Sequence, residues 1–250
     1  MGVFQNNLLA GAAGQAGGGA AALYDYQIEQ SIRIGGNDNL RRTPSSAGNR
    51  TVWTFSAWIK RSDISIDQNQ IWEAGTSGGT SSRLFYYFYY GQPRASSGTV
   101  NFGALTPELR DTSAWMHFVL KHTGGVTTAY QNGTSLGTWS ISGDTAFNST
   151  VAHGLGCRAS GSNNSINSYM AEVIFSDGTA YEPTQFAESK NGVWIPKDPS
   201  GTTFGTNGFH LKFENASDLG NDSSGNNNDY TSSMGTDHQV LDSPTVGTGS

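Results

Sequence analysis

Carboxylate side chains are the first residues in this chain that could carry chemistry. Enzymes that hydrolyse glycosidic bonds place two carboxyl groups on either side of the bond, so their acids meet on one strand face. No Glu-x-Asp-x-Glu or similar cluster occurs in this sequence. The glutamates that stand singly include Glu73, Glu108, Glu172, Glu182 and Glu188. We interpret each as a solvated charge at the rim of the fold, and we do not expect an enzyme.

The histidines show no pattern of catalysis or metal binding either. They are His117, His122, His153, His210 and His238. Their spacing matches no metal-ligand motif, and no Ser or Cys nucleophile motif lies near them. Two of them, His117 and His210, fall in predicted strands, where a histidine with satisfied hydrogen bonds is the usual outcome. No cofactor is expected from them.

The most unusual composition lies at residues 84–90, which read Leu-Phe-Tyr-Tyr-Phe-Tyr-Tyr. Exposed aromatic rings stack on sugars and their hydroxyl groups form hydrogen bonds, so the run could form a glycan platform. A strand covered on both faces, in the core or at a subunit interface, would have the same composition. Both interpretations stay open. The candidate carbohydrate or subunit contacts are Trp72, Tyr86, Tyr87, Tyr89 and Tyr90.

A second candidate site is the run Asp-Ser-Ser-Gly-Asn-Asn-Asn-Asp at residues 222–229. Its carboxylate and amide oxygens are ligands that Ca²⁺ prefers, with Asp222, Asn226 and Asn228 as candidate metal ligands. Asp38 and Asp177 are supplementary candidates. The run lacks the full acidic series of an EF-hand, and Asn, Asp, Ser and Gly are also ordinary turn residues. A structural turn is the alternative to a calcium site.

Alternating side chains predict the strands that must position these residues. Residues 54–60 (Thr-Phe-Ser-Ala-Trp-Ile-Lys) and 114–121 (Ala-Trp-Met-His-Phe-Val-Leu-Lys) both read as strands. In the first, we expect Phe55, Ala57 and Ile59 to face the core. In the second, we expect the core side chains to be Trp115, His117 and Val119, with Met116, Phe118 and Leu120 on the other face. Asn132-Gly133 after Tyr130 predicts a hairpin with a type I′ turn, because both central residues need positive φ.

Composition places the chain in the all-β class as one domain. Glycine contributes 33 of 250 residues and charged residues only 14%, which suits short strands joined by tight turns. The net charge of −6 and the absence of a Lys/Arg cluster argue against nucleic acid as a partner. Cys157 is the single cysteine, so no internal disulfide can form, as in proteins made in a reducing cytoplasm. No apolar run is long enough for a membrane-spanning helix, so we expect no membrane insertion.

These motifs resemble the LamG-like, concanavalin A-like jelly-roll family. The resemblance rests on the two strands above, on the aromatic-x-Asn-Gly hairpin and on residues 169–175 (Tyr-Met-Ala-Glu-Val-Ile-Phe) with Asp177-Gly178. It continues through 209–213 (Phe-His-Leu-Lys-Phe) and 222–230, and covers roughly residues 28 to 232. It implies a two-sheet antiparallel sandwich. The Phe…Asp-Ser-Ser-Gly-Asn element opens many such domains but comes last here, so the order looks circularly permuted, which a sandwich with adjacent termini tolerates.

Further phrases resemble LamG-type proteins of marine tailed bacteriophages. They are residues 31–34, 40–50, 192–196 and 242–244. This resemblance implies a virion structural protein, made in the host cytoplasm, that is a tail fibre, appendage or capsid-decoration subunit. It also implies a homo-oligomer, most simply a trimer, and a host-surface glycan as a ligand. The alternatives are a free carbohydrate-binding lectin and a glycan-degrading enzyme.

Residues 1–27 differ from the rest of the chain. Residues 10–22 are Gly or Ala except for Gln15, and the preceding tip carries Val3, Phe4, Leu8 and Leu9. A Gly/Ala tract is costly to order, so one interpretation is a loose tail, and Ala also permits helix. The apolar tip favours the other, in which an extended or partly helical arm docks on other virion proteins. We therefore expect an attachment arm (1–27), a jelly-roll domain (28–232) and a C-terminal tail (233–250).

Overall fold

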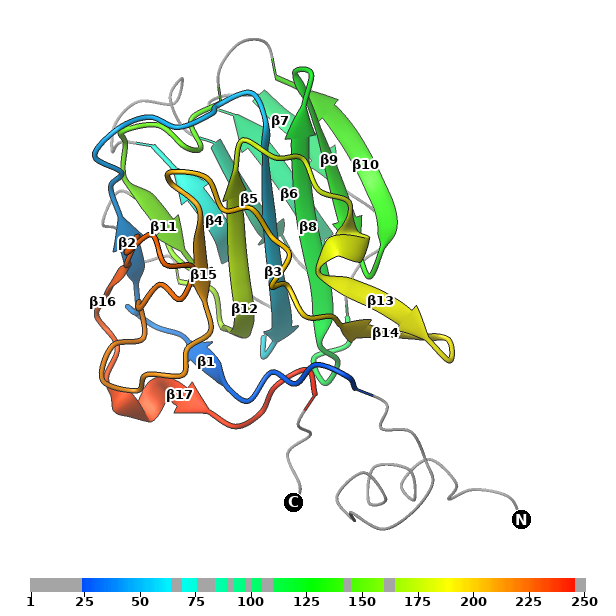
Figure 1. Ribbon diagram of the computed structural model, residues 1–250, viewed down its shortest axis with the longest axis vertical. Helices are drawn as coiled ribbons and strands as arrows, with labels where there is room; N and C mark the ends of the chain where they lie inside the picture. Colours follow the sequence, from blue (N-terminus) through cyan, green and yellow to red (C-terminus); the bar gives the residue numbers. More distant parts are fainter. Residues whose placement is uncertain are drawn as a thin grey trace.

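The structure is a computed structural model that describes residues 24–63, 69–75, 84–89, 92–97, 100–104, 110–141, 145–159 and 165–245. Two antiparallel sheets stack face to face, with sheet B behind sheet A in Figure 1. The expected all-β jelly-roll sandwich is therefore confirmed. The tip residues Val3, Phe4, Leu8 and Leu9 lie outside the described residues. Within the described ranges no helix is long and apolar enough to span a bilayer.

Sheet A forms the front layer of the sandwich. Its strands, in spatial order, are β10 (Thr134–Ser140), β9 (Val126–Gln131), β8 (Met116–Thr123), β3 (Trp53–Arg61), β12 (Ser168–Asp177), β1 (Ser31–Ile34) and β17 (Gln239–Val240). β15 (Phe209–Leu211) also pairs with β12, on the same edge as β1 but further along the strand. Sheet B contains β16 (Thr231–Ser232), β2 (Leu40–Arg42), β11 (His153–Leu155), β4 (Asn69–Ala74), β5 (Leu84–Tyr89), β6 (Gln92–Ser97) and β7 (Val100–Ala104).

The hydrophobic core lies between the sheets and centres on Trp72 of β4. Its ring stacks on Phe55 of sheet A, with centroids 4.5 Å apart, and on Phe147, with centroids 3.7 Å apart. Trp53 meets the same ring edge-on at 5.8 Å. Trp72 is only 1% exposed. One side chain of sheet B therefore contacts sheet A and the loop that precedes β11.

The core-facing set was predicted correctly for β3 but inverted for β8. Phe55, Ala57 and Ile59 belong to the main core, as expected. They pair with Leu120, Phe118 and Met116, and paired residues share a face of the sheet, so these three enter the core. Trp115, His117 and Val119 instead lie on the outer face of sheet A. The expectation that Trp115 is a core residue was therefore wrong, and its side chain is partly buried outside the core.

A two-stranded hairpin, β13 (Ala187–Lys190) and β14 (Val193–Pro196), covers part of that outer face. His117 stacks between Trp58 of β3 and Trp194 of β14, with ring centroids 4.9 and 6.2 Å away. Trp194 Nε1 donates to His117 Nδ1 at 3.2 Å, which fixes Nδ1 as an acceptor. Nε2 then donates to Ser56 Oγ at 2.8 Å. Burial lowers the pKa of His117 to about 3, so the ring is neutral.

The N- and C-terminal segments interlock beside sheet A. Ile28 N–H donates to the hydroxyl of Thr245, and the hydroxyls of Ser243 and Thr245 donate back to the Ile28 carbonyl. The expected C-terminal tail (233–250) is thus wrong for residues 239–245, because β17 and these hydroxyls belong to the sandwich. Two short 3₁₀ helices, η2 (Pro183–Gln185) and η3 (Thr236–His238), lie in the connections.

Glu172 marks a bulge in β12. Its φ is +49°, and the pairing with β3 shifts register between Ala171 and Ile174. Its carboxylate accepts the Tyr26 hydroxyl at 2.8 Å and faces His210 Nε2 at 2.6 Å. Burial, and then Glu172, raise the pKa of Tyr26 above its usual value, so the hydroxyl remains a donor. This buried group attaches the N-terminal segment to sheet A.

Replacing Trp72 with Ala tests the core assignment. Loss of a buried aromatic costs roughly 3–5 kcal/mol, and we expect Trp72→Ala to lose that much unfolding free energy. Trp115→Ala is the matched variant, with a clearly smaller loss because its ring is only partly buried. Urea unfolding of both variants measures the difference. Equal losses would contradict the assignment of the two faces of β8.

The buried histidines predict acid sensitivity. Burial lowers the pKa of His117 to about 3 and that of His153 to about 4, whereas both bind protons near pH 6.5 when unfolded. The contribution of these two histidines to the unfolding free energy is complete above pH 6.5. It is lost as the pH falls towards their pKa values in the folded protein. From about pH 7 to about pH 5 we expect the unfolding free energy to drop by roughly 2 kcal/mol per histidine.

Carboxylates stay largely ionised above about pH 5, so this window reports mainly on histidines. His117→Gln, which cannot titrate, should be less stable at pH 7 but show a shallower decline. Urea unfolding at the two pH values is the measurement, and equal stability at both would disprove the neutral, buried assignment.

Candidate functional site

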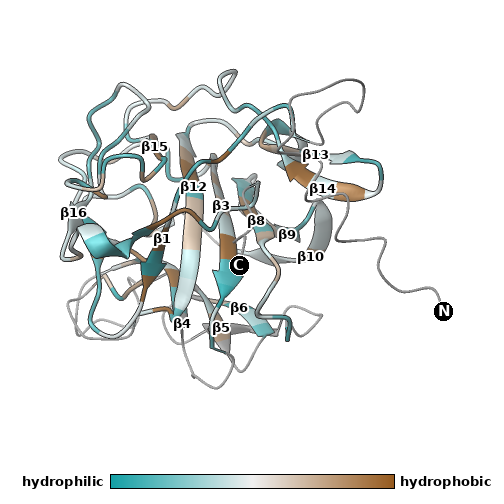
Figure 2. Cartoon of the chain, turned by 90° about the horizontal axis from the view of Figure 1, so that it is seen from below, coloured by the Kyte–Doolittle hydropathy of each residue, from teal (hydrophilic) through white to brown (hydrophobic). Residues whose placement is uncertain are grey.

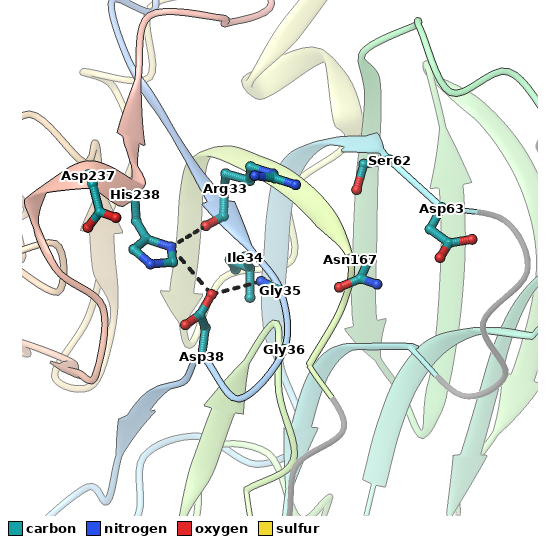
Figure 3. A pocket seen from close by; sticks show the side chains of 10 residues that line it. All are labelled: Arg33, Ile34, Gly35, Gly36, Asp38, Ser62, Asp63, Asn167, Asp237 and His238. Carbon is teal, nitrogen blue, oxygen red and sulfur yellow. Dashed lines mark hydrogen bonds and ion pairs between the residues drawn. The ribbon is translucent and has the colours of Figure 1, made fainter.

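The candidate site is a polar pocket of about 510 Å³ at the end of β1 (Figure 3). We call it the β1 pocket. Its lining combines a guanidinium, three carboxylates, an amide and an imidazole, contributed by separate segments of the chain. These side chains are Arg33, Asp38, Asp63, Asn167, Asp237 and His238.

A tight turn after β1 forms one wall. Gly36 adopts φ +61°, and the Asp38 N–H donates to the Gly35 carbonyl at 3.1 Å. Asp38 Oδ2 accepts the Gly35 N–H at 2.8 Å, and the Ser165 hydroxyl donates to the Asp38 carbonyl at 2.5 Å. The turn thus holds the Asp38 carboxylate in place by local contacts, as Asp does in many turns.

His238 connects this turn with the C-terminal segment. Its Nδ1 lies 2.8 Å from the Arg33 carbonyl and 3.3 Å from Asp38 Oδ2. Both partners are acceptors, so Nδ1 carries the proton and Nε2 is the nitrogen that can accept a hydrogen bond in the neutral ring. The residue comes from η3, which brings Asp237 to the pocket as well.

The opposite wall comes from the end of β3 and the residue before β12. The Ser62 N–H donates to the Asn167 carbonyl at 3.1 Å. The buried Arg61 donates from Nη2 to the Asp63 carbonyl at 3.0 Å and lies 4.7 Å from the Phe88 ring centroid. Arg61 therefore fixes the main chain that presents Asp63. Figure 3 shows Ser62, Asp63 and Asn167 on the side of the pocket away from His238.

The pocket can exchange hydrogen bonds with a hydroxyl-rich ligand. Carboxylates accept, Arg33 donates, and the amide of Asn167 does both. Arg33 is exposed, and its guanidinium has no hydrogen bond or ion pair with the described residues. Across the described ranges no group of three or more His, Cys, Asp or Glu side chains is arranged to hold a metal ion.

The structure contradicts part of the aromatic platform. Trp72 lies in the core, and Tyr87 is only 5% exposed. At these exposures neither side chain presents a ring face to a glycan or to another subunit. The side chains of Tyr86, Tyr89 and Tyr90 lie outside the described part of the structure.

The 222–229 run forms a hydrogen-bonded turn. Asp222 Oδ1 accepts the N–H groups of His210 and Ser224, and Oδ2 accepts the Asn228 N–H and the Ser224 hydroxyl, at 2.8–2.9 Å. The amide nitrogen of Asn226 donates to the Gly205 and Gly208 carbonyls. Asn228 Oδ1 accepts a hydrogen bond from Arg42 Nη2, and the Asn228 amide nitrogen donates to the carbonyls of Thr206 and Gly208. These contacts use the Asp222 and Asn228 oxygens that a cation would need.

Asp177 is occupied in a similar way. Its carboxylate accepts the N–H groups of Asn49 and Asn207 and the side-chain amide of Asn148. Asn148 Oδ1 in turn accepts the side-chain amide of Asn207 at 2.9 Å. This buried network joins three loops at the opposite end of β12 from the β1 pocket.

Sequence reasoning found only one residue of the β1 pocket, namely Asp38, as a supplementary calcium ligand. Arg33, Asp63, Asn167, Asp237 and His238 were missed. They lie on segments that are up to 205 residues apart in sequence, as in the His238–Arg33 contact. No local motif joins them, so only the pairing of β1 with β12 and β17 brings them together.

Comparison with known proteins gives the family and the fold. Residues 35–185 match the model of a family described as the concanavalin A-like lectin/glucanases superfamily. A Bacteroides ovatus structure, provisionally described as a carbohydrate binding protein, is similar with a TM-score of 0.61 and 17% identity over 88% of this chain. The match covers 62% of that protein, so the chain spans less than two thirds of it. No curated protein sequence matches.

Two further solved structures are more distant. A SAP-like pentraxin from Limulus polyphemus has a TM-score of 0.47 at 16% identity, covering 65% of this chain and 80% of the pentraxin. The CBM40 of the Ruminococcus gnavus IT-sialidase, bound to alpha2,3 sialyllactose, has a TM-score of 0.46 at 12% identity, covering 64% and 96% of the two chains.

Proposed function

The chain belongs to the concanavalin A-like lectin/glucanases superfamily, and we propose that it is a carbohydrate-binding member without glycosidase activity that serves as a structural subunit of a tailed-phage virion. The fold alone does not decide between binding and catalysis, since such sandwiches support both. The proposal therefore depends on the β1 pocket and on the chain termini.

The β1 pocket is the observation that carries carbohydrate binding. Carboxylate, amide and guanidinium groups converge there from β1, from η3 and from the ends of β3 and β12. Convergent polar groups in a concave site are what a saccharide needs, because its hydroxyls donate and accept in many directions. The description of the Bacteroides ovatus relative as carbohydrate binding agrees with this proposal.

The hydrogen bonds in the pocket favour binding over hydrolysis. Glycosidases hold one carboxyl group as a proton donor and a second as nucleophile or base across the bond. Asp38 instead accepts the Gly35 N–H and faces the protonated Nδ1 of His238, which are contacts of a positioned hydrogen-bond acceptor. A glycan-degrading enzyme is therefore the weaker alternative.

Attachment to a particle is the second part of the proposal. The first and last described segments lie side by side through Ile28, Ser243 and Thr245. An anchor that precedes residue 24 would leave from the edge of sheet A where these two segments meet. The resemblance to phage proteins supports virion proteins as partners and a trimer, in which several copies raise avidity. The rival is a free lectin with the same pocket.

Substitutions in the pocket test carbohydrate binding. On an array of immobilised glycans, we expect Asp63→Ala and Asp237→Ala each to weaken binding to the strongest hits by about 10-fold or more, because each removes a charged acceptor. Asp198→Ala, an exposed aspartate on a connecting loop, is the matched control and should bind normally. Unchanged binding by both pocket variants would refute the site.

Deletion of residues 1–23 tests attachment. The truncated protein keeps Tyr26 and Ile28 and should fold with an unchanged thermal midpoint, because their contacts with Glu172 and Thr245 are intact. We expect it to bind glycans on the array but to be missing from purified phage particles. If the truncated protein occupied the particles normally, residues 1–23 would not be an attachment arm. If the full-length protein never joined particles, the free lectin would be favoured.

A further inference from the structure

A row of cross-strand neighbours continues from the β1 pocket along the outer face of sheet A. Arg33 of β1 pairs with Tyr169 of β12, and Tyr169 pairs with Lys60 of β3. Ile59 pairs with Met116, so Trp115, the residue before β8, lies beside Lys60. Adjacent strands are about 4.8 Å apart, so the row spans about 14 Å. Figure 2 looks onto this end of the sandwich, where β1, β12 and β3 lie side by side.

The two aromatic rings of this row are held in place by Lys60. Its Nζ lies 4.7 Å from the Tyr169 ring centroid and 5.8 Å from that of Trp115. The rings themselves are 6.4 Å apart at 67°. Asp242 of the C-terminal segment forms an ion pair with Lys60 and accepts the Trp115 Nε1–H at 3.1 Å. The cation is therefore neutralised by a neighbour, and its role in the row is to brace the rings.

The row retains accessible binding groups. Tyr169 and Trp115 are both partly exposed, whereas Ile32, Ile59 and Met170, on the other face of the same strands, are fully buried in the core. The Tyr169 hydroxyl forms no hydrogen bond with the residues that the structure describes. The Arg33 guanidinium, likewise without a hydrogen bond or ion pair to the described residues, joins the row to the pocket. Aromatic faces beside free polar groups suit the C–H faces and hydroxyls of a sugar chain.

The charge of the site indicates which sugars fit. The β1 pocket presents three carboxylates to a ligand, with the guanidinium of Arg33 in its lining and the buried Arg61 behind Asp63, and Lys60 is paired with Asp242. A uronate or sulfate group would meet net negative charge, and like charges placed together are unfavourable. Hydroxyl groups meet no such penalty, because carboxylates accept them and Arg33 donates to them.

We propose that Tyr169 and Trp115 extend the β1 pocket into a binding strip for a neutral, extended oligosaccharide, whose terminal unit occupies the pocket while the next units stack along the strip. This inference rests on the proposed carbohydrate-binding function and goes further, because it assigns the ligand as uncharged and longer than one unit. It also assigns each part of the ligand to named side chains.

The test measures how affinity depends on the length of the ligand. Titration calorimetry compares monomers and hexamers of neutral cello-, laminari-, xylo- and manno-oligosaccharides with alginate hexamers, which carry carboxylates. For at least one neutral series we expect the hexamer to bind about 10-fold or more tightly than the monomer. Alginate should bind more weakly than that hexamer. Tighter binding of alginate, no binding by any neutral series or no dependence on length would each overturn the inference.

Variants separate the strip from the pocket. Tyr169→Ala should abolish the tighter binding of the hexamer relative to the monomer, whereas Tyr169→Phe, which keeps the ring, should retain most of it. Arg33→Ala should weaken the binding of both the monomer and the hexamer. Thermal midpoints identify any variant that fails to fold. If Tyr169→Ala does not fold, the dependence of affinity on ligand length is compared between Tyr169→Phe, a Trp115→Phe variant and the unchanged protein. If folded Tyr169→Ala still binds the hexamer more tightly than the monomer by the full factor, the binding strip is wrong.

These outcomes differ from a failure of the proposed function. If the pocket variants Asp63→Ala and Asp237→Ala lose glycan binding but length has no effect, the pocket stands and the strip is wrong. If the pocket variants bind glycans normally on the array, the proposed site itself is wrong, whatever the length dependence shows.

Discussion

The stacking of Trp72 between Phe55 and Phe147 is the contact on which the arrangement of the two sheets depends. Trp72 comes from β4, Phe55 from β3 and Phe147 from the loop before β11, so one ring fixes the spacing of both sheets and the position of that loop. Large aromatic rings bury much area, and close stacking leaves little freedom to shift. The faces of sheet A therefore have fixed roles, one turned to the core and one available for the outer layer and the proposed ligand.

The outer face of sheet A is divided between structure and proposed function. Towards β8 and β9, the β13–β14 hairpin covers it, and the neutral His117 joins the two layers through Ser56 and Trp194. Ile28 and Ala187 cover this face at Trp58 and Ala171, and the Tyr169–Lys60–Trp115 row and the β1 pocket lie next to this cluster, towards β1. The C-terminal segment bounds this region through Asp242. A ligand bound there would contact residues held by the sandwich itself, which lowers the entropic cost of ordering a site.

Polar residues that could be ligands in sequence instead connect loops in the structure. Asp222 organises the turn at 222–229, and Asp177 joins Asn49, Asn148 and Asn207. Buried carboxylates are costly unless donors surround them, and main-chain N–H groups supply these donors here. Short Asp/Asn/Ser/Gly runs have the same composition in a turn and in a cation site, so composition alone could not separate them.

The sequence by itself determined the class of the fold and several of its central strands. Alternation gave β3 and β8, Asn132-Gly133 gave the hairpin between β9 and β10, with φ of 46° and 76°, and the motifs gave the family. It could not determine which face of β8 is the core, because apolar side chains occupy both faces and alternation is then symmetric. The pairing Phe55–Leu120 decided it. The β1 pocket was also beyond local reasoning, because its walls come from segments far apart in sequence. Only the pairing of β1 with β12 and β17 brings Arg33, Asn167 and His238 together, and hydrogen bonding between distant strands leaves no signature in a short stretch of sequence.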